Sequence, residues 1–279
     1  MYIVFDIGGT KTRVGASEDG RTLYDTVIRE TPRSFSNGLT MLDDAVRSLT
    51  NGRPITAIAG GVAGVLCRET SRLTTAPNLP EWAHKPLRAR LQDAFMAPVL
   101  IENDAALAGL GEAVCGAGAG DAIVAYLTIG TGIGGARIVH GAIDENIYGF
   151  EPGHQIMLFR QDPDGAMRAC DLESLASGRT LERKYGKDAF DDPDHPLWKE
   201  ASYMLACGIY NTVLYWSPTS IVLGGPLFRN THMLKMVIER LSALPAIFPS
   251  MPEIKRSSLE EMSGLHGALA LIREKCDLD

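Results

Sequence analysis

Two glycine-rich strings, each following an apolar strand, constrain this chain more than any other feature. The first, Asp6 to Thr10, stands between the predicted strands Tyr2 to Phe5 and Thr12 to Ala16. The second, Gly130 to Gly135, follows the predicted strand Ala122 to Ile129. Short apolar runs bounded by turn residues are typical of strands. The sequence therefore predicts two hairpins whose turns are rich in glycine.

The chemistry of the first string suits a phosphate group. Gly8 and Gly9 let the backbone turn tightly and bring its N–H groups against phosphate oxygens. Thr10 supplies a hydroxyl and Lys11 a counter-charge, while Asp6 is a candidate ligand for Mg²⁺, directly or through water. The alternative is a hairpin turn that contains Gly-Gly for purely structural reasons.

The second string has glycines with a hydroxyl between them, and Thr131, Gly132 and Gly134 are its candidate phosphate-binding residues. It lacks the terminal Gly-Lys-Ser/Thr of a Walker loop. A third string, Gly224-Gly225-Pro226, follows a predicted strand, where Gly225 is a candidate contact for adenine or ribose or only forms a tight turn. Two phosphate loops, one in each half of the chain, indicate a nucleotide held across a cleft.

The length of 279 residues predicts two lobes, since single cores stop growing near about 250–300 residues. We place an N-terminal α/β lobe at residues 1–110 and a C-terminal α/β lobe at 111–264, with a C-terminal helix, 265–279, packed back on the first lobe. Apolar periodicity predicts further helices at 38–49, 86–95, 104–115, 197–215, 227–241 and 265–275, and further strands at 55–62, 99–102, 136–140 and 220–223.

Composition and charge exclude several classes of function. The net charge is −7, and no block of basic residues is present that would follow a nucleic-acid backbone. No signal peptide or uninterrupted apolar run of about 20 residues is visible, so we expect no membrane contact and a cytoplasmic location. The five cysteines are widely spaced, without a C-x-x-C pair that would indicate zinc or redox chemistry.

A candidate catalytic group lies in Glu102-Asn103-Asp104, where a predicted strand ends and an alanine-rich helix begins. Asn103 or Asp104 at this position is a natural helix cap, which is the structural alternative. The functional interpretation is that Asp104 accepts the proton of an attacking hydroxyl during phosphoryl transfer.

Taken together, the motifs resemble the ROK family of bacterial sugar kinases. The motifs that carry the resemblance are Asp6 to Thr10, Asn103-Asp104-Ala105, Gly130 to Gly135, Glu151-Pro152-Gly153-His154 and Gly224-Gly225, in that order. This resemblance covers nearly the whole chain. It implies the two-lobed, actin-like ATPase (ribonuclease H-like) fold of the actin and hexokinase superfamily, with a nucleotide and sugar cleft between the lobes.

The resemblance also implies roles for individual residues. Asp104 matches the family's catalytic base, and the residues that match its sugar-binding positions are Gly61, Asn78, Asn103, Asp104, Glu151, His154 and Glu173. Carboxylates and amides make the paired hydrogen bonds that a polyol requires. Each also has a structural alternative: Asn78 forms a turn, Glu151 and Glu173 are solvated, and His154 is an ordinary histidine.

One family feature is missing. Many ROK kinases bind a structural zinc through this histidine and three cysteines. The family spacing places Asp164, Ala166 and Asp171 at the cysteine positions, while Glu173 keeps its register. We therefore expect no structural zinc and a His154 without a metal to orient it. Ala106, where the family often has asparagine, is a second departure.

We thus predict an ATP- and magnesium-dependent hexose kinase acting on the 6-hydroxyl. An N-acetylmannosamine or N-acetylglucosamine kinase is the first alternative, and a fructokinase the second. A sugar-sensing repressor of the family is not expected, because Asp6 leaves no room for a preceding DNA-binding domain. The family also suggests a homodimer, and the choice between ATP and polyphosphate as donor stays open.

Overall fold

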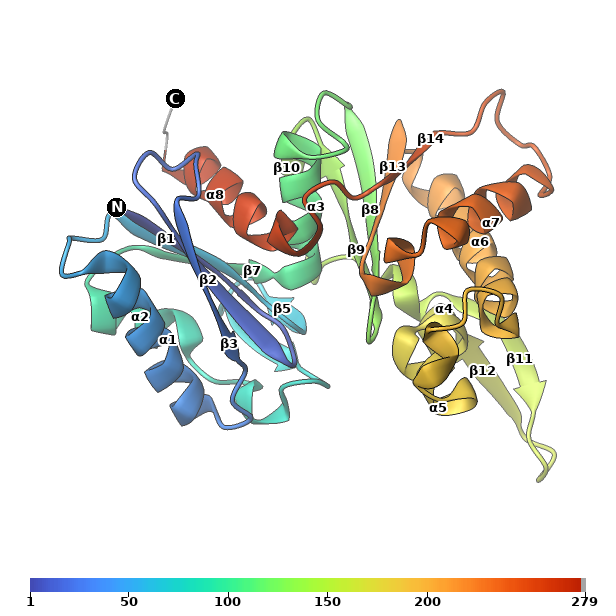
Figure 1. Ribbon diagram of the computed structural model, residues 1–279, viewed down its shortest axis with the longest axis horizontal. Helices are drawn as coiled ribbons and strands as arrows, with labels where there is room; N and C mark the ends of the chain where they lie inside the picture. Colours follow the sequence, from blue (N-terminus) through green and yellow to red (C-terminus); the bar gives the residue numbers. More distant parts are fainter. Residues whose placement is uncertain (277–279) are drawn as a thin grey trace.

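A computed structural model describes residues 1–276 of the chain, which form two α/β lobes side by side (Figure 1). The sheet of the first lobe has the order β3-β2-β1-β4-β7. Strands β1 to β3 form an antiparallel meander, and β4 and β7 run parallel to β1. These strands are β1 (Tyr2–Ile7), β2 (Lys11–Ser17), β3 (Asp25–Glu30), β4 (Ala57–Val62) and β7 (Val99–Asn103).

The sheet of the second lobe repeats this plan, with the order β10-β9-β8-β13-β14. An antiparallel hairpin again comes first, and β13 and β14 run parallel to β8. Its strands are β8 (Ile123–Ile129), β9 (Ile133–Val139), β10 (Ala142–Ile143), β13 (Ser220–Gly224) and β14 (Glu253–Arg256). The predicted pair of glycine-turn hairpins is confirmed as β1–β2 and β8–β9.

Each sheet has helices on its outer face. Helices α1 (Phe35–Thr50) and α2 (Leu87–Phe95) cover the first sheet, and their apolar sides share one core with β1 and β4. The second sheet is covered by α4 (Leu172–Ala176), α5 (Gly178–Tyr185), α6 (Pro196–Trp216) and α7 (Thr231–Ser242). None of the helices within residues 1–276 is both long and apolar enough to cross a bilayer.

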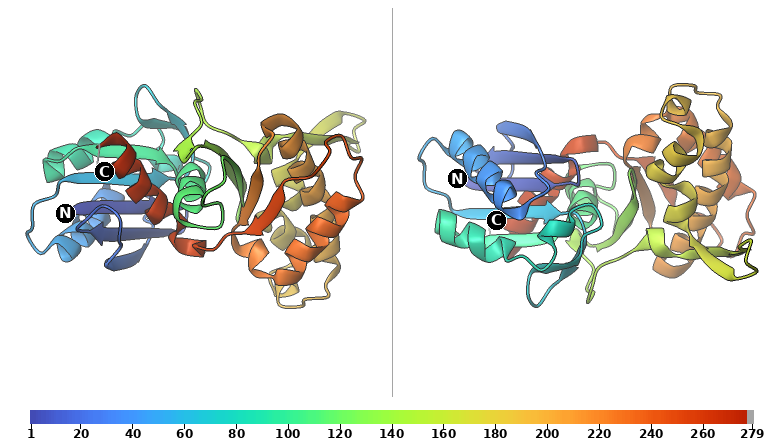
Figure 2. Two further views of the ribbon diagram at one scale, coloured as in Figure 1. Left: turned by 90° about the horizontal axis from the view of Figure 1, so that it is seen from above. Right: turned by 90° about the horizontal axis from the view of Figure 1, so that it is seen from below.

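Helices α3 (Asp104–Cys115) and α8 (Ser263–Lys275) lie between the two sheets (Figures 1 and 2). They cross so closely that a Cβ on Gly111 would lie 2.1 Å from the Ser263 carbonyl oxygen, and one on Gly267 would lie 1.8 Å from that of Leu107. Helix α8 also packs against β1 and β4 of the first sheet. The predicted lobe boundary at residue 110 falls inside α3 and stays a prediction, and residues 277–279 of the predicted C-terminal helix lie outside the described residues.

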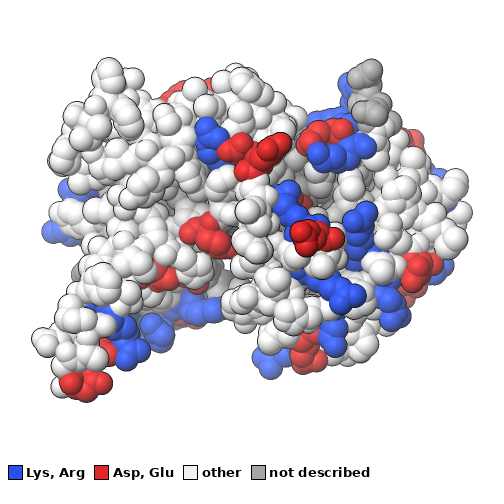
Figure 3. All heavy atoms as spheres, turned by 180° about the vertical axis from the view of Figure 1, so that it is seen from behind, with Lys and Arg blue, Asp and Glu red and all other residues white. Residues whose placement is uncertain are grey.

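Several short elements complete the chain. Strands β5 (Val65–Cys67) and β6 (Arg72–Thr75) form a small hairpin near the cleft, followed by a 3₁₀ turn at Pro80–Trp82. Strands β11 (Ile156–Gln161) and β12 (Met167–Asp171) form a second hairpin that projects from the C-terminal lobe (Figure 1). On the face seen in Figure 3, basic side chains are interspersed with acidic ones. The projecting hairpin carries an ion pair between Arg168 and Asp162.

One predicted element is wrong. The sequence predicted a single helix over Leu227 to Leu241, but a 3₁₀ turn at Pro226–Arg229 precedes α7. The helical geometry is interrupted at Asn230, whose side chain accepts a hydrogen bond from the His232 N–H at 2.9 Å and caps the start of α7. The apolar spacing alone does not show where a helix begins, and here the asparagine cap sets the start of α7 at Thr231.

Candidate active site

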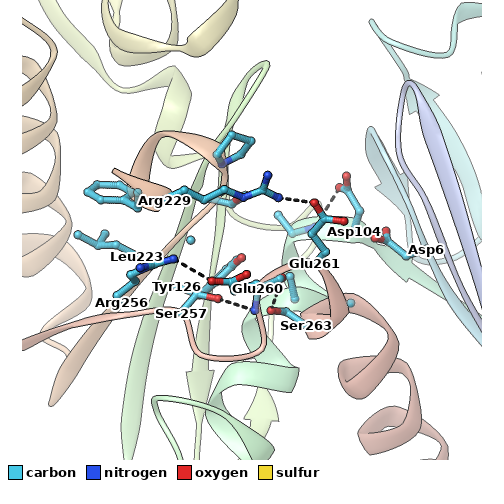
Figure 4. A pocket seen from close by; sticks show the side chains of 18 of the residues that line it. Asp6, Asp104, Tyr126, Leu223, Arg229, Arg256, Ser257, Glu260, Glu261 and Ser263 are labelled. Carbon is cyan, nitrogen blue, oxygen red and sulfur yellow. Dashed lines mark hydrogen bonds and ion pairs between the residues drawn. The ribbon is translucent and has the colours of Figure 1, made fainter. Parts of the chain in front are cut away.

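Two cavities open between the lobes and meet at Asp104. The Gly225 cavity, about 270 Å³ in volume, and the Asn78 cavity, about 750 Å³, share Asp104, Ala105 and Thr128 in their walls. The Gly225 cavity is bounded by the ends of β1 and β13 and by the segment that leads into α8 (Figure 4). The Asn78 cavity is bounded by both glycine hairpins and by the loops that follow β6 and β10.

Asp104 is the first residue of α3 and directly follows the end of β7. Its carboxylate accepts a hydrogen bond from the Ala105 N–H at 2.9 Å. Burial raises the pKa of Asp104 above its ordinary value, which makes it a stronger base than an exposed aspartate. A carboxylate in the shared wall reaches a ligand in either cavity.

Asp6, near the end of β1, is the second carboxylate of the Gly225 cavity and lies at the same end as Asp104 (Figure 4). Burial and the neighbouring Asp104 charge raise the pKa of Asp6 from 3.8 to about 7, against the opposing effect of Arg13. Within residues 1–276 its carboxylate accepts no hydrogen bond, so its charge is under-compensated.

This pair of carboxylates fits a magnesium ion. Mg²⁺ prefers oxygen ligands and is usually bound by one or two carboxylates together with substrate phosphates. No group of three or more His, Cys, Asp or Glu side chains in the described part of the chain forms a dedicated metal cage. The donor set is therefore one that would hold Mg²⁺ together with a phosphorylated ligand, through Asp6 directly or through water.

The two glycine hairpins bring their turns to the Asn78 cavity. Gly9 and Thr10 of the first turn line it, whereas Gly8 and Lys11 close the turn through a 3.0 Å backbone hydrogen bond and line neither cavity. Arg13, two residues beyond Lys11 on β2, lines the Gly225 cavity instead.

All the predicted phosphate-binding residues of the second turn line the Asn78 cavity. Thr131, Gly132 and Gly134 all line the Asn78 cavity, and the turn is closed by a 2.9 Å hydrogen bond from the Gly130 N–H to the Gly132 carbonyl. Thr128, at the end of β8, lines both cavities. The backbone of this turn therefore lies where the two cavities meet.

Gly225 lies at the end of β13, on the wall of the cavity named for it. Its φ is +89°, and a Cβ there would lie 2.4 Å from the Ile129 carbonyl oxygen, so no other residue fits. Leu223 and Phe228 flank it with apolar surface. A close backbone beside apolar side chains suits a flat ring.

The predicted sugar-binding side chains gather in the other cavity. Asn78, Asn103, Glu151, His154 and Glu173 all line the Asn78 cavity, from four separate segments of the chain. Gly61 does not line it: its Cα lies against the backbone of Asp104, where a Cβ would come within 2.9 Å of the Asp104 Cα.

Asn103 has a structural task as well. Its side-chain oxygen accepts a hydrogen bond from the Ala106 N–H at 2.9 Å and so caps α3, and its amide donates to the Gly64 carbonyl at 3.0 Å. The capping alternative is therefore observed. One amide N–H of Asn103 is left to bind a ligand.

His154 and Glu173 are held by hydrogen bonds. The His154 Nδ1 lies 2.8 Å from an Asp171 carboxylate oxygen, and this contact raises the pKa of His154. The Glu173 carboxylate accepts a hydrogen bond from the Ile133 N–H at 2.6 Å, which joins this glutamate to the second glycine hairpin. Asp171, at one of the positions where the family spacing would place a cysteine, thus contacts the histidine directly.

Sequence reasoning missed several residues of these cavities or next to them, among them three arginines and Asp171. At the Gly225 cavity, Arg229 donates to Glu261 (Figure 4), and Arg13 donates to the same carboxylate. Arg179 donates to Asn78 at the Asn78 cavity, and Asp171 contacts His154. None belongs to a glycine string, and Asp171 entered the sequence analysis only as a residue that replaces a cysteine of the family's zinc segment. Only the spacing of Arg13 from Lys11, which puts both on one face of a strand, is a signal in the sequence.

The family model that describes the ROK family matches residues 2–275. The chain belongs to the ROK family. It is 32% identical to the glucokinase of Streptomyces coelicolor, over 75% of this chain and 64% of that protein. The glucokinase of Thermotoga maritima is 28% identical, with 97% and 96% covered, and the N-acetyl-D-glucosamine kinase of Escherichia fergusonii is 28% identical, with 97% and 99% covered.

Solved ROK structures share the fold. A ROK hexokinase from Thermus thermophilus superposes with a TM-score of 0.80 at 29% identity, over 99% of both chains. A ROK glucokinase from Streptomyces griseus, in complex with glucose and AMPPNP, gives 0.82 at 25% identity, over 98% of this chain and 99% of that one. The predictions of an actin-like α/β fold and of an ATP-dependent ROK sugar kinase are confirmed.

Proposed function

We propose that this ROK kinase transfers the terminal phosphoryl group of ATP to the 6-hydroxyl of a hexose. The observation that carries the proposal is the position of Asp104 in the wall shared by the two cavities. A sugar in the Asn78 cavity and a nucleotide in the Gly225 cavity would both reach it. The Streptomyces griseus glucokinase, which binds glucose together with AMPPNP, supports this pairing of ligands.

The proposed reaction has one chemical step. The hydroxyl oxygen of the sugar attacks the terminal phosphorus, the hydroxyl proton passes to the Asp104 carboxylate, and the bond from phosphorus to the bridging oxygen breaks to release ADP. The N–H groups of the second glycine turn, beside Thr131, stabilise charge on the phosphoryl oxygens. Asp6 would hold Mg²⁺, directly or through water, and the ion would supply positive charge beside the phosphates.

The sugar end of the reaction rests on Asn78, Glu151 and Glu173. Glu151 and Glu173 offer acceptors for sugar hydroxyls, and Asn78 offers an amide. Burial, together with the charges of Asp104 and Glu173, raises the pKa of Glu151, so hydroxyl donors from a bound sugar would stabilise its ionised form.

An N-acetylhexosamine kinase is the second candidate. The Asn78 cavity, about 750 Å³ in volume, is as large as cavities that hold ligands bigger than one hexose. The full-length similarity to an N-acetyl-D-glucosamine kinase favours the same alternative. Fructokinase is a third candidate. The homodimer, the cytoplasmic location and the absence of structural zinc stay predictions.

A substrate panel tests the proposal. ADP release and sugar phosphate would be measured with ATP and Mg²⁺ against glucose, mannose, fructose, N-acetylglucosamine and N-acetylmannosamine, with polyphosphate as a second donor. We expect the highest kcat/KM with glucose. If only the acetylated sugars are phosphorylated, the substrate is an N-acetylhexosamine and not glucose. If none of the sugars is phosphorylated, the proposal is contradicted.

A further inference from the structure

Arg179 is the one basic side chain of α5 that reaches across the cleft to the other lobe. It is the second residue of α5 in the C-terminal lobe, and its Nη2 donates a 2.5 Å hydrogen bond to the Oδ1 of Asn78 in the N-terminal lobe. Both residues line the Asn78 cavity. In the described part of the chain Arg179 forms no ion pair, so its partner is a neutral amide of the site itself.

The backbone at Arg179 is hydrogen-bonded to the second glycine turn. The Gly178 N–H donates to the Gly130 carbonyl at 2.7 Å, and the Arg179 N–H donates to the Thr131 carbonyl at 3.4 Å. Ser177 caps the helix just before them by accepting from the Thr180 N–H. These hydrogen bonds join the start of α5 to the second glycine turn.

Asn78, the partner of Arg179, packs against the first glycine turn. A Cβ on Gly9 would lie 2.7 Å from the Asn78 Cβ, so the Asn78 loop lies directly against that turn. A continuous set of contacts thus runs from Gly130 through Arg179 and Asn78 to Gly9. It closes around the Asn78 cavity and joins the two glycine turns across the cleft.

Arg179 also fixes which atoms Asn78 presents. Because Asn78 Oδ1 accepts from the guanidinium, the amide offers its N–H groups as donors to a ligand. We propose that Arg179 is a positioning residue that orients Asn78 for the sugar and links sugar binding to the closure of both glycine turns on the nucleotide. This rests on the proposed function for the identity of the two ligands.

The variants are Arg179→Ala, Arg179→Lys and the matched control Arg183→Ala, an exposed arginine one helical turn further along α5. Calorimetry would measure the affinity for AMPPNP with and without a saturating sugar, using glucose or N-acetylmannosamine according to which one the wild type phosphorylates. In the wild type the sugar should raise AMPPNP affinity by about 5-fold or more, a typical coupling between sites.

In Arg179→Ala we expect that coupling to fall below about 2-fold and the sugar KM to rise about 10-fold, a loss of the size expected for one hydrogen bond to a charged group. AMPPNP affinity without sugar should stay within about 2-fold, because Arg179 does not line the Gly225 cavity. Arg179→Lys should restore little, because a lysine lacks the planar guanidinium. Wild-type coupling and KM in Arg179→Ala would overturn the proposal.

Hydrogen exchange of the ligand-free protein separates this inference from the proposed function. Amides around Asn78 and at residues 130–132 should exchange faster in Arg179→Ala than in the wild type, and at the wild-type rate in Arg183→Ala. Unchanged exchange in Arg179→Ala would refute the contact. A wild type that phosphorylates no sugar would instead contradict the proposed function, while the exchange result would still decide on Arg179.

Discussion

At the scale of single residues, the site gathers carboxylates that have too few positive partners. Asp6, Asp104 and Glu151 each have a raised pKa, in every case chiefly through burial. Such groups reduce the stability of the empty protein and favour a ligand that brings cations or hydroxyl donors. Function and stability therefore conflict at these positions.

Asp6→Asn tests this conflict. The pKa of Asp6 is about 7 in the folded protein and 3.8 when unfolded, so the folded state keeps a proton that the unfolded state releases, and stability falls as pH rises through that window. Without magnesium or nucleotide, the variant should be more stable than the wild type by up to about 4 kcal/mol at pH 8, because one pKa unit corresponds to about 1.4 kcal/mol, and equal to it at pH 3. Thermal melts at both pH values measure this, and the exposed Asp93→Asn is the control. An equal loss of stability at both pH values would contradict it.

His154 provides a second test at this scale. Asp171→Asn keeps the cap of α4, because asparagine caps helices as well as aspartate, but removes the charge beside the ring. We expect the pKa of His154, followed by NMR, to fall, and the sugar KM to rise about 5-fold with kcat nearly unchanged. Asp171→Ala should in addition lose about 1 kcal/mol of stability with the cap. An unchanged His154 pKa in Asp171→Asn would show that this carboxylate does not hold the ring.

The resemblance to the family predicted most of the side chains that meet in the Asn78 cavity, although Gly61 does not line it. It did not predict Asp171 or Arg179 as partners of His154 and Asn78. Arg179 and Asn78 are far apart in the sequence and lie in different lobes, so their contact depends on how the lobes pack. No local pattern carries that information.

At the scale of elements, the crossing of α3 and α8 holds the lobes together. The buried Glu112 of α3 accepts hydrogen bonds from Ser257 Oγ at 2.6 Å, Ser263 Oγ at 2.8 Å and the Leu259 N–H at 2.9 Å. Burial disfavours its charge, but these donors outweigh burial and lower its pKa. The segment they fix leads into α8 and lines the Gly225 cavity.

Gly267→Ala tests this crossing. A Cβ at position 267 would lie 1.8 Å from the Leu107 carbonyl oxygen, and only a shift of one helix relieves that clash. We expect a loss of about 3 kcal/mol, larger than the gain of about 1 kcal/mol in helix propensity. Denaturant melts would measure it, with the exposed Glu274→Ala on the same helix as control. A stabilised Gly267→Ala would mean that the helices do not cross this closely.

The elements that the sequence failed to predict are polar ones. Strand β3 is mostly exposed at a sheet edge, and β11–β12 projects from the lobe, so neither shows the apolar alternation of a half-buried strand. The short α4 and α5 begin at the side-chain caps Asp171 and Ser177. By contrast, β1, β4 and β8 are mostly apolar, and their prediction was confirmed within two residues.

At the scale of the whole molecule, the chain repeats one plan twice and places its chemistry where the repeats face each other. Each sheet begins with a glycine-turn hairpin, and the turns of β1–β2 and β8–β9 meet at the Asn78 cavity. The two cavities meet at Asp104, with Ala105 and Thr128 as the other shared wall residues. An attacking hydroxyl and a phosphoryl group brought together there would be shielded from water when the lobes close.

The central claim is that Asp104 is the base of this phosphoryl transfer, and Asp104→Asn tests it most directly. The amide keeps the shape but accepts no proton, so kcat on the best sugar of the panel should fall about 100- to 10,000-fold. Calorimetric affinities for sugar and AMPPNP should stay within a few-fold of the wild type. A variant that binds both ligands and retains near-normal turnover would contradict the account.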